Sequence, residues 1–356
     1  MESNTPEAIM HRAIRLARKG AGFVQSNPLV GSVLVHQSGK ILAESFHDHW
    51  GGPHAEQKLL KNIKPPRSAS LYVTLEPCCH TGKTPPCVDL IIASGIKHVV
   101  VGSIDPNPLM QGKSIRQLRR AGIKVEVGVA QTECDYLIRT FRKWITTNQP
   151  YVLGKVGMSL DAKITSGNQQ RYITNQLALQ RVHELRQEFS VIMVGVNTII
   201  RDNPRLDTRL AKKKLHHPVK VILDSRLRTP PHSAALDDHT IIVCADSATM
   251  THKRALARTG AEILEFPSDQ QHGELILAEL GRRGYSNVLL EGGSYVFTSF
   301  INLRAIDEFY LFMAPYLFGA LRLPFTYALR HPVQLIDPVF EQLEDNILIR
   351  GYAQYK

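Results

Sequence analysis

The chain has 356 residues, of which 43% are hydrophobic and 21% are charged, and its formal net charge is +11 at pH 7. This length suits two globular domains that each bury a core. No run approaches the roughly 18 apolar residues that span a bilayer, and the first ten residues resemble no signal peptide, so we expect a cytoplasmic protein with no membrane partner. The positive charge suits nucleic acid, but equally an enzyme whose ligands carry phosphates.

Strand and helix signals alternate through the first part of the chain. Thr5, Pro6 and Glu7 mark the start of a helix whose apolar residues are spaced for one buried face. A helix that begins near Pro86 and another that closes at Gly122 separate some of the predicted strands. These strands cover residues 30–36, 70–76, 98–105 and 124–130. The alternation is typical of βαβ units in a largely parallel sheet with helices on both faces.

A domain boundary is indicated by the stretch RTFRKWITTNQP, residues 139–150, because its polar tail ends at Pro150 and a new strand pattern begins at Tyr151. Strands with helices between them are then predicted at residues 151–160, 191–196, 218–224, 240–246 and 287–293. We therefore predict two α/β domains, residues 1–148 and 149–356.

The stretch TLEPCCHTGKTPPC, residues 74–87, holds three of the five cysteines. In a reducing compartment such an uneven set indicates metal binding or catalysis more than a disulfide framework. Upstream, His54 and Glu56 lie two residues apart at the predicted start of a helix. One histidine and two thiolates can hold Zn²⁺ on three sides and leave the fourth to a water whose pKa the metal lowers towards about 7. With Glu56 as proton shuttle, this is the arrangement of the zinc-dependent deaminases.

The spacing of the cysteines departs from the usual deaminase pattern. Nucleoside deaminases have Pro-Cys-x-x-Cys, whereas a loop of eight residues separates Cys78 from Cys87. Cys79 could add a fourth protein ligand and close the site, which would make it a structural zinc staple. The neighbouring Glu56 favours a catalytic site.

These motifs resemble those of a known family. HAE at residues 54–56 and the stretch from Glu76 to Cys87 are similar to motifs of the bifunctional diaminohydroxyphosphoribosylaminopyrimidine deaminase and 5-amino-6-(5-phosphoribosylamino)uracil reductase of riboflavin biosynthesis, and the resemblance covers nearly the whole chain. It implies a cytidine-deaminase-like α/β/α zinc-deaminase domain followed by a dihydrofolate-reductase-like α/β domain that binds NADPH. The family usually has serine at the position of Cys79. The resemblance therefore implies one zinc per chain, held by His54, Cys78 and Cys87.

The resemblance also assigns polar residues of the first domain to a phosphorylated pyrimidine substrate. These are Asn27, His47, His80, Lys83, Asp105 and Asn107. An asparagine amide offers both a donor and an acceptor to a pyrimidine edge, and a lysine is a point charge suited to phosphate. The sequences NP and DPNP are also ordinary turns, so a purely structural role remains open for each residue.

In the second half, the segments SLDAKI, VGVNTIIRDNPRLDTR, VILDSR and LLEGGSYVF follow the order found in the reductase domain of that family. The implied NADPH contacts are Gly157, Tyr172, Thr198, Asp202, Ser225, Gly293, Ser294, Tyr295, Val296, Phe297, Thr298 and Ser299. The implied substrate contacts are Lys163, Gln170, Arg186, Leu206, Arg209 and Glu291. The two arginines can fork onto phosphate oxygens. The chain departs from the family pattern at Ala162, Gln170, Tyr172, Tyr316 and Gly319-Ala320.

The predicted function is zinc-dependent deamination of 2,5-diamino-6-ribosylamino-4(3H)-pyrimidinone 5′-phosphate, with Glu56 carrying the proton, followed by NADPH reduction of the ribosyl group to ribityl. We expect a homo-oligomer, a dimer or tetramer, and no nucleic-acid partner. Three alternatives are a deaminase whose reductase domain has lost activity, a nucleic-acid base deaminase, and a zinc-stapled NADP-binding scaffold. The second is disfavoured because the second half lacks an alternating basic and aromatic stripe.

Overall fold

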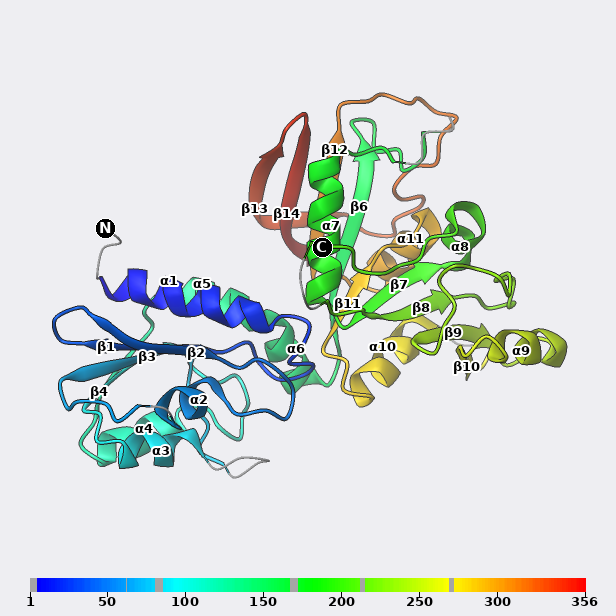
Figure 1. Cartoon of the computed structure of the whole chain (residues 1–356). Helices are drawn as coiled ribbons and strands as arrows, with labels where there is room; N and C mark the ends of the chain where they lie inside the picture. The colour runs from blue at the N-terminus through cyan, green and yellow to red at the C-terminus, as the bar shows by residue number, and fades with distance from the viewer. Residues whose placement is uncertain (1–4, 62, 81–85, 167–171, 212–214, 269–271) are drawn as a thin grey trace. The chain divides into compact units, whose positions relative to one another are not determined.

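The computed structural model describes residues 5–61, 63–80, 86–166, 172–211, 215–268 and 272–356. The chain divides into two compact units, Met1–Asn148 and Gln149–Lys356, each with its own sheet (Figure 1). No helix in the described ranges is long and apolar enough to cross a membrane.

The first unit is built on a five-stranded sheet in the order β2-β1-β3-β4-β5. Its strands are β1 (Gly31–His36), β2 (Ile41–Phe46), β3 (Ala69–Leu75), β4 (His98–Ser103) and β5 (Lys124–Val127). Its helices are α1 (Pro6–Ala17), the short 3-10 helix η1 (Arg18–Gly20), α2 (Ala55–Lys61), α3 (Cys87–Ala93), α4 (Lys113–Arg120), α5 (Gln131–Leu137) and α6 (Arg139–Thr147). Helices α1 and α5 cover one face of the sheet, and α2, α3 and α4 cover the other (Figure 1).

Alternation along the strands creates this three-layer arrangement. On β3, Leu71 and Val73 pack with α2, α3 and α4, whereas Tyr72 between them packs with α1 and α5. The first helix lies directly on β1 at Gly31, where an added Cβ would come within 2.0 Å of the Ala13 carbonyl oxygen. A glycine is therefore required at this contact.

The second unit is built on a nine-stranded sheet in the order β10-β9-β8-β7-β11-β6-β12-β14-β13. Its strands are β6 (Tyr151–Ser159), β7 (Val191–Gly195), β8 (Val219–Leu223), β9 (Thr240–Ala245), β10 (Glu262–Phe266), β11 (Asn287–Leu290), β12 (Glu308–Ala314), β13 (Val333–Leu343) and β14 (Asn346–Tyr355). Its helices are α7 (Gln176–Glu188), α8 (Val196–Asp202), α9 (Met250–Ala257), α10 (His272–Arg282) and α11 (Ser294–Asn302). Every pair from β10 to β12 is parallel, and β14 pairs antiparallel with β12 and β13.

The predicted strands are all present, and the predicted first helix begins at Pro6 with the Thr5 hydroxyl accepting from the Ala8 amide at 3.3 Å. Five strands were not predicted, namely β2, β10, β12, β13 and β14. The expectation of a largely parallel sheet is correct for the second unit but wrong for the first, where β1 is antiparallel to both β2 and β3. The antiparallel pair of β1 and β2 is a tight hairpin through Gly39, whose positive φ of 84° turns the chain straight back.

Candidate active site

Three predicted metal ligands converge in the first unit. His54 lies immediately before α2, Cys78 follows β3, and Cys87 is the first residue of α3. The His54 Nδ1 atom lies 3.4 Å from each sulfur, and the three ligand atoms lie within 4.8 Å of one another. A zinc ion bonded to one nitrogen and two sulfurs at tetrahedral angles would place nitrogen and sulfur about 3.5 Å apart. The donor set therefore fits zinc in both chemistry and spacing.

The two cysteines differ in their protonation. The hydrogen bond from Cys87 is the main cause that lowers the pKa of Cys78 to about 4, against the burial that raises it. The same bond, together with burial, raises the pKa of Cys87 well above its ordinary value. The two thiols thus share one proton, and because zinc binds cysteine as the thiolate, both would be deprotonated in the metal-bound site. Cys79 is half-buried against the apolar cluster under α2, α3 and α4, and is absent from the group of ligand atoms found among the described residues.

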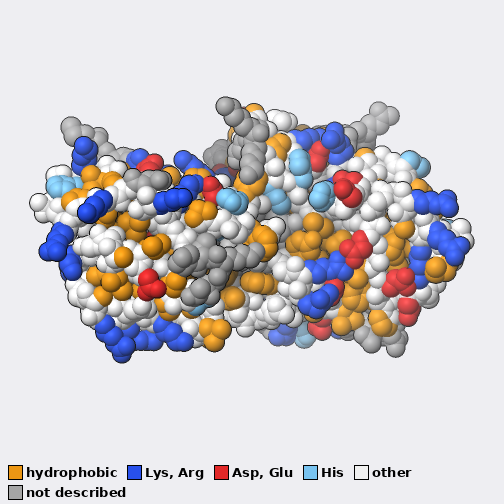
Figure 2. All heavy atoms as spheres, turned by 60° about the horizontal axis from the view of Figure 1, so that its bottom comes forward, with side chains coloured by type: hydrophobic (Ala, Val, Ile, Leu, Met, Phe, Trp, Pro, Cys, Tyr) orange, Lys and Arg blue, Asp and Glu red, His pale blue; other side chains and the backbone are white. Residues whose placement is uncertain are grey.

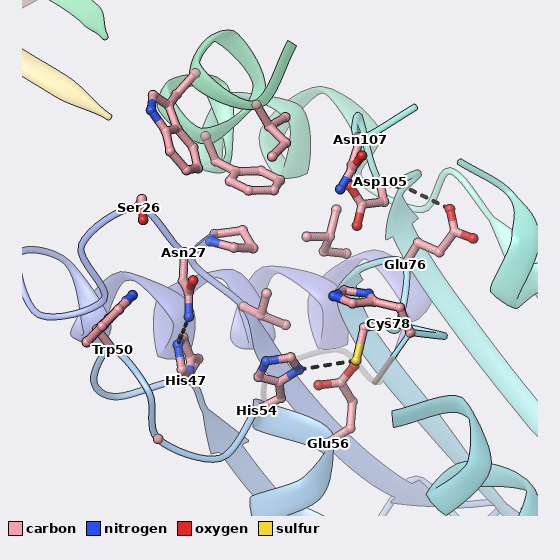
Figure 3. A pocket seen from close by; sticks show the side chains of 18 of the residues that line it. Ser26, Asn27, His47, Trp50, His54, Glu56, Glu76, Cys78, Asp105 and Asn107 are labelled. Carbon is pink, nitrogen blue, oxygen red and sulfur yellow. Dashed lines mark hydrogen bonds between the residues drawn. The ribbon is translucent and has the colours of Figure 1, made fainter. Parts of the chain in front are cut away.

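Glu56 is the second residue of α2, and its side chain lies beside His54 and Cys78 (Figure 3). It is 3% exposed. Burial is the main cause that raises its pKa to about 7, and the charge of Cys78 adds to the effect. A buried carboxyl group next to a set of metal ligands is placed to accept and return a proton.

Two of the predicted metal ligands, His54 and Cys78, line a cavity of about 330 Å³. Among the predicted residues, Asn27, His47, His54, Glu56, Cys78, His80, Asp105 and Asn107 line it. Asn27 Nδ2 donates to His47 Nε2 at 3.0 Å, and His47 Nδ1 lies 3.1 Å from the Pro53 carbonyl (Figure 3). Burial lowers the pKa of His47, so a neutral ring donates to Pro53 and accepts from Asn27. Lys83 lies outside the described residues.

Glu76 organises the opposite wall, a role that the sequence did not suggest. Its carboxylate is 3% exposed and accepts from the amides of Asp105 at 3.2 Å, Gly112 at 2.9 Å and Ser114 at 3.1 Å, and from the Ser114 hydroxyl at 2.6 Å. These bonds hold the loop that carries Asp105 and Asn107 against the end of β3. A glutamate between an apolar strand and a Pro-Cys pair was the only signal in the sequence.

In the second unit, the segments predicted to bind the cofactor lie at one edge of the sheet. Gly157, Thr198, Ser225 and Gly293 lie in or after β6, β7, β8 and β11, which are parallel and form a continuous run in the sheet. Ligands bind at this carboxyl edge in open α/β sheets. Gly293 is the N-cap of α11 with no side-chain cap, and a Cβ added there would meet open space. The helix amides are therefore placed to receive a phosphate, which fits a dinucleotide.

The remaining cofactor residues occupy different environments. Asp202 is paired with Arg201 at 2.9 Å, and Phe297 is only 1% exposed within the apolar core. Two more cofactor residues are exposed tyrosines, Tyr172 and Tyr295. Tyr295 lies in α11, as do Phe297 and the remaining members of the set: Ser294, Val296, Thr298 and Ser299.

A buried cluster of charged side chains contains two predicted substrate residues, Arg186 and Glu291, and a third residue, Lys155, that the sequence analysis did not single out. Arg186 Nε and one terminal nitrogen bond to the Glu291 carboxylate at 2.8 and 2.9 Å, and Lys155 Nζ lies 3.0 Å from the same carboxylate. The guanidinium fork of Arg186, expected to hold phosphate, is thus directed at Glu291. Burial raises the pKa of Glu291, but the two cations overcome this and hold it far below its usual range. A lone cation within the apolar strand YVLGKVGMS was the signal for Lys155.

The other predicted substrate residues of this unit are less enclosed. Arg209 is half-exposed, its backbone amide donates to His183 Nδ1 at 3.2 Å, and its guanidinium lies 3.3 Å from Asp207. Leu206 is 2% exposed, and its φ of 55° is left-handed. Lys163 forms an isolated bridge with Pro324. Gln170 lies outside the described residues.

The departures at Ala162, Tyr316 and Gly319 lie around one turn. Ala162 has a φ of 56°, a conformation that favours glycine. The adjacent Asp161 carboxylate accepts from the amides of Phe318 at 3.1 Å and Gly319 at 2.7 Å. The altered segment around Tyr316 is thereby tied to the end of β6, next to Lys163.

The excess of basic residues forms no continuous stripe on the described part of the face shown in Figure 2, where Lys and Arg lie in small separate groups. Several basic side chains are paired with acids, as in Arg181 with Glu341 at 2.6 Å and Arg283 with Glu262 at 2.8 Å. A tract suited to a nucleic-acid backbone is not visible on that face.

Comparison with known proteins matches a different family to each unit. Residues 3–103 match the cytidine and deoxycytidylate deaminase zinc-binding region, and residues 150–346 match the RibD C-terminal domain. These matches assign zinc to the first unit and a nicotinamide cofactor to the second. The predicted fold, a cytidine-deaminase-like domain followed by a reductase domain, is confirmed.

Relatives cover most of the chain. It is 40% identical over 317 residues to the riboflavin biosynthesis protein RibD of Actinobacillus pleuropneumoniae, which covers 87% of this chain and 84% of that protein. The structure of Acinetobacter baumannii RibD, form 1, is similar with a TM-score of 0.84, 31% identity and 98% coverage of both chains. That of a diaminohydroxyphosphoribosylaminopyrimidine deaminase/5-amino-6-(5-phosphoribosylamino)uracil reductase from Thermotoga maritima is similar with a TM-score of 0.82, 35% identity and 98% coverage of both chains. The chain thus belongs to the RibD family and is a bifunctional deaminase and reductase of riboflavin biosynthesis.

Proposed function

We propose that the chain deaminates 2,5-diamino-6-ribosylamino-4(3H)-pyrimidinone 5′-phosphate and then reduces the ribosyl group of the product to ribityl with NADPH. The observation that carries the proposal is the meeting of His54, Cys78 and Cys87 beside buried Glu56, at a cavity lined by polar side chains. The similar protein of Thermotoga maritima is described by this pair of activities. Residues 1–148 would carry the deaminase and residues 149–356 the reductase, in a cytoplasmic homo-oligomer.

In the first unit, His54, Cys78 and Cys87 would hold one zinc ion per chain. The ion would supply Lewis acidity and lower the pKa of the attacking water. Glu56 takes a proton from that water and delivers it to the exocyclic nitrogen, so that ammonia leaves and a ring carbonyl remains. The Glu56 carboxyl is placed for this by α2, whose preceding residue is the ligand His54.

The polar wall orients the pyrimidine. The hydrogen bonds from Asn27 to His47 and from His47 to Pro53 fix the orientation of the Asn27 amide, so its oxygen can accept from a ring amine. Asp105 and Asn107, held by Glu76, would contact another edge of the ring, with His80 at the exposed rim. Lys83 is the proposed partner of the substrate phosphate.

In the second unit, the amides at the start of α11 would bind a phosphate of NADPH, and Gly157, Tyr172, Thr198, Asp202 and Ser225 would line the rest of the cofactor site. The cofactor would supply a hydride to C1′ of the ribosyl group. Arg209 offers its half-exposed guanidinium to the substrate phosphate, and Leu206 and Gln170 complete the proposed set of substrate contacts. Arg186, Glu291 and Lys163 would also contact this substrate.

The test separates the two reactions. The Glu56→Gln variant should keep zinc but release ammonia at least about 10²-fold more slowly, because it loses its proton carrier. The same variant should oxidise NADPH at the wild-type rate when it is supplied with the already deaminated ribosylaminouracil phosphate. Near-normal ammonia release by this variant would remove Glu56 from its role, and failure of the wild type to use the deaminated compound would remove the reductase half of the proposal.

A further inference from the structure

One wall of the deaminase cavity is apolar and comes from a single helix. Phe141, Trp144 and Ile145 of α6 all line the cavity. They are spaced i, i+3 and i+4, so they share one face of the helix. The other residues of α6 are polar, as the sequence RTFRKWITT shows. The cavity is therefore bounded by an apolar stripe as well as by the polar side chains already described.

This stripe is not part of the two large apolar clusters of its unit. The two apolar clusters that the described residues of this unit form include side chains from α1 to α5, but neither includes Phe141, Trp144 or Ile145. Phe141 is 9% exposed, and the other two are half-buried. Ligand cavities are typically lined by apolar and aromatic side chains together with a few polar groups, and this stripe supplies the aromatic part of the lining.

The pyrimidine ring of the proposed substrate has surfaces that match an apolar wall. A pyrimidine has a polar edge, read by groups such as Asn27 and Asp105, and two flat π faces. Deaminases that act on bases hold those faces against aromatic and apolar side chains. A tryptophan offers the largest such surface, and its stacking does not depend on the substituents of the ring.

We propose that the α6 stripe, with Trp144 as its main contact, is the stacking surface for the pyrimidine ring of the substrate. The inference rests on the proposed deaminase function and extends it. It makes α6, the last helix before the second unit, part of the first active site. Loss of one stacking contact should weaken binding about 5- to 100-fold.

The first measurement is the steady-state rate of ammonia release by the full-length, zinc-loaded chain. Trp144→Ala and Trp144→Leu should raise KM about 5- to 100-fold while kcat changes less than about threefold, because stacking contributes equally to substrate and transition-state binding. Leucine keeps an apolar side chain at this position, so it is less disruptive to folding than alanine. Trp144→Phe keeps an aromatic face and should restore most of the affinity.

A matched control lies on the same helix. Thr146 is exposed and its hydroxyl donates to the Arg142 carbonyl at 2.7 Å, so Thr146→Ala changes α6 without touching the stripe and should leave KM unchanged. An unchanged KM in both Trp144→Leu and Trp144→Ala would overturn the inference. Absence of ammonia release by the wild type would instead overturn the proposed function itself.

Intrinsic fluorescence gives an independent measurement. The chain has two tryptophans, Trp50 and Trp144, and both line this cavity. In a Trp50→Phe, Glu56→Gln double variant, Trp144 is the only tryptophan, so excitation selective for tryptophan reports on it alone, and the substrate is barely turned over. Titration with the diaminopyrimidine phosphate should then quench the emission of Trp144 in a saturable way. Unchanged emission at concentrations that saturate the wild type would contradict stacking.

Discussion

Replacing Glu291 by glutamine is expected to destabilise the second unit strongly. The carboxylate bonds to Arg186 at 2.8 and 2.9 Å and to Lys155 at 3.0 Å, and the three side chains are 7%, 10% and 16% exposed respectively. Removing one partner of a buried ion pair costs about 3–5 kcal/mol, because the remaining charges stay buried. Glutamine keeps the shape and one acceptor oxygen, so we expect about 3 kcal/mol. For a unit of roughly 200 residues this lowers Tm by about 6–12 °C.

A half-exposed pair of the same chemistry provides the control. Arg181 forks onto Glu341 at 2.6 and 2.9 Å, with side chains 38% and 39% exposed. Such surface pairs contribute about 0.2–1 kcal/mol, so Glu341→Gln should change the free energy of unfolding by no more than that. Urea or thermal unfolding followed by circular dichroism would compare the two variants. Equal losses in both variants would refute the claim that burial of the Glu291 cluster sets its contribution.

The contribution of Glu291 to the free energy of unfolding should depend on pH in a defined direction. The folded pKa of Glu291 is depressed by the two cations despite burial, so its contribution is present above the unfolded pKa of about 4.3 and is lost as pH falls towards the folded value. The difference in unfolding free energy between wild type and Glu291→Gln should therefore be constant from about pH 5 to 8 and narrow below about pH 4. A difference that grows on acidification would contradict this assignment.

Three further predictions concern single side chains. Cys79→Ser should leave zinc content and ammonia release nearly unchanged, since Cys79 does not belong to the group of metal-ligand atoms found among the described residues. Loss of zinc in a metal analysis of this variant would reject His54, Cys78 and Cys87 as the ligand set. Glu76→Gln should keep zinc but raise the KM of deamination about tenfold, because the glutamine NH2 group would face backbone N–H groups that donate to the Glu76 carboxylate in the wild type. A KM equal to that of the wild type would show that the loop carrying Asp105 does not depend on Glu76. Ala162→Gly should raise the stability of the second unit by up to about 1 kcal/mol in urea unfolding, because a φ of 56° strains alanine; a lower stability would show that the turn is not strained.

Local patterns predicted the helix at Pro6, the buried parallel strands and the place where the pattern restarts after Pro150, because these depend on capping, on continuous apolar runs and on turn residues. The unpredicted strands carry weaker local signals. In β13 most residues are exposed or half-exposed, so its sequence VQLIDPVFEQL shows no clear alternation. It exists because β14 pairs with it over most of its length.

In the candidate site, too, some residues could be predicted from local sequence and others could not. The set of His54, Cys78 and Cys87 with Glu56 could be predicted because zinc chemistry demands these residue types and because the motifs resemble those of a known family, although the cysteine spacing departs from the usual deaminase pattern. Glu76, Lys155 and the α6 stripe could not, because their roles depend on which segments the fold brings together. The phosphate role expected for Arg186 stays a prediction, and the fold explains why its fork is engaged: β11 and β6 are neighbours, which brings Glu291 and Lys155 to one place beside α7.

The most direct test of the two-site account is simultaneous measurement of ammonia and NADPH during steady-state turnover of 2,5-diamino-6-ribosylamino-4(3H)-pyrimidinone 5′-phosphate by the zinc-loaded wild-type chain. The account predicts one ammonia released for each NADPH oxidised, and no NADPH oxidation from this substrate after zinc is removed. Ammonia release without any NADPH oxidation, including when the deaminated compound is supplied, would contradict the account and leave the second unit without its reaction.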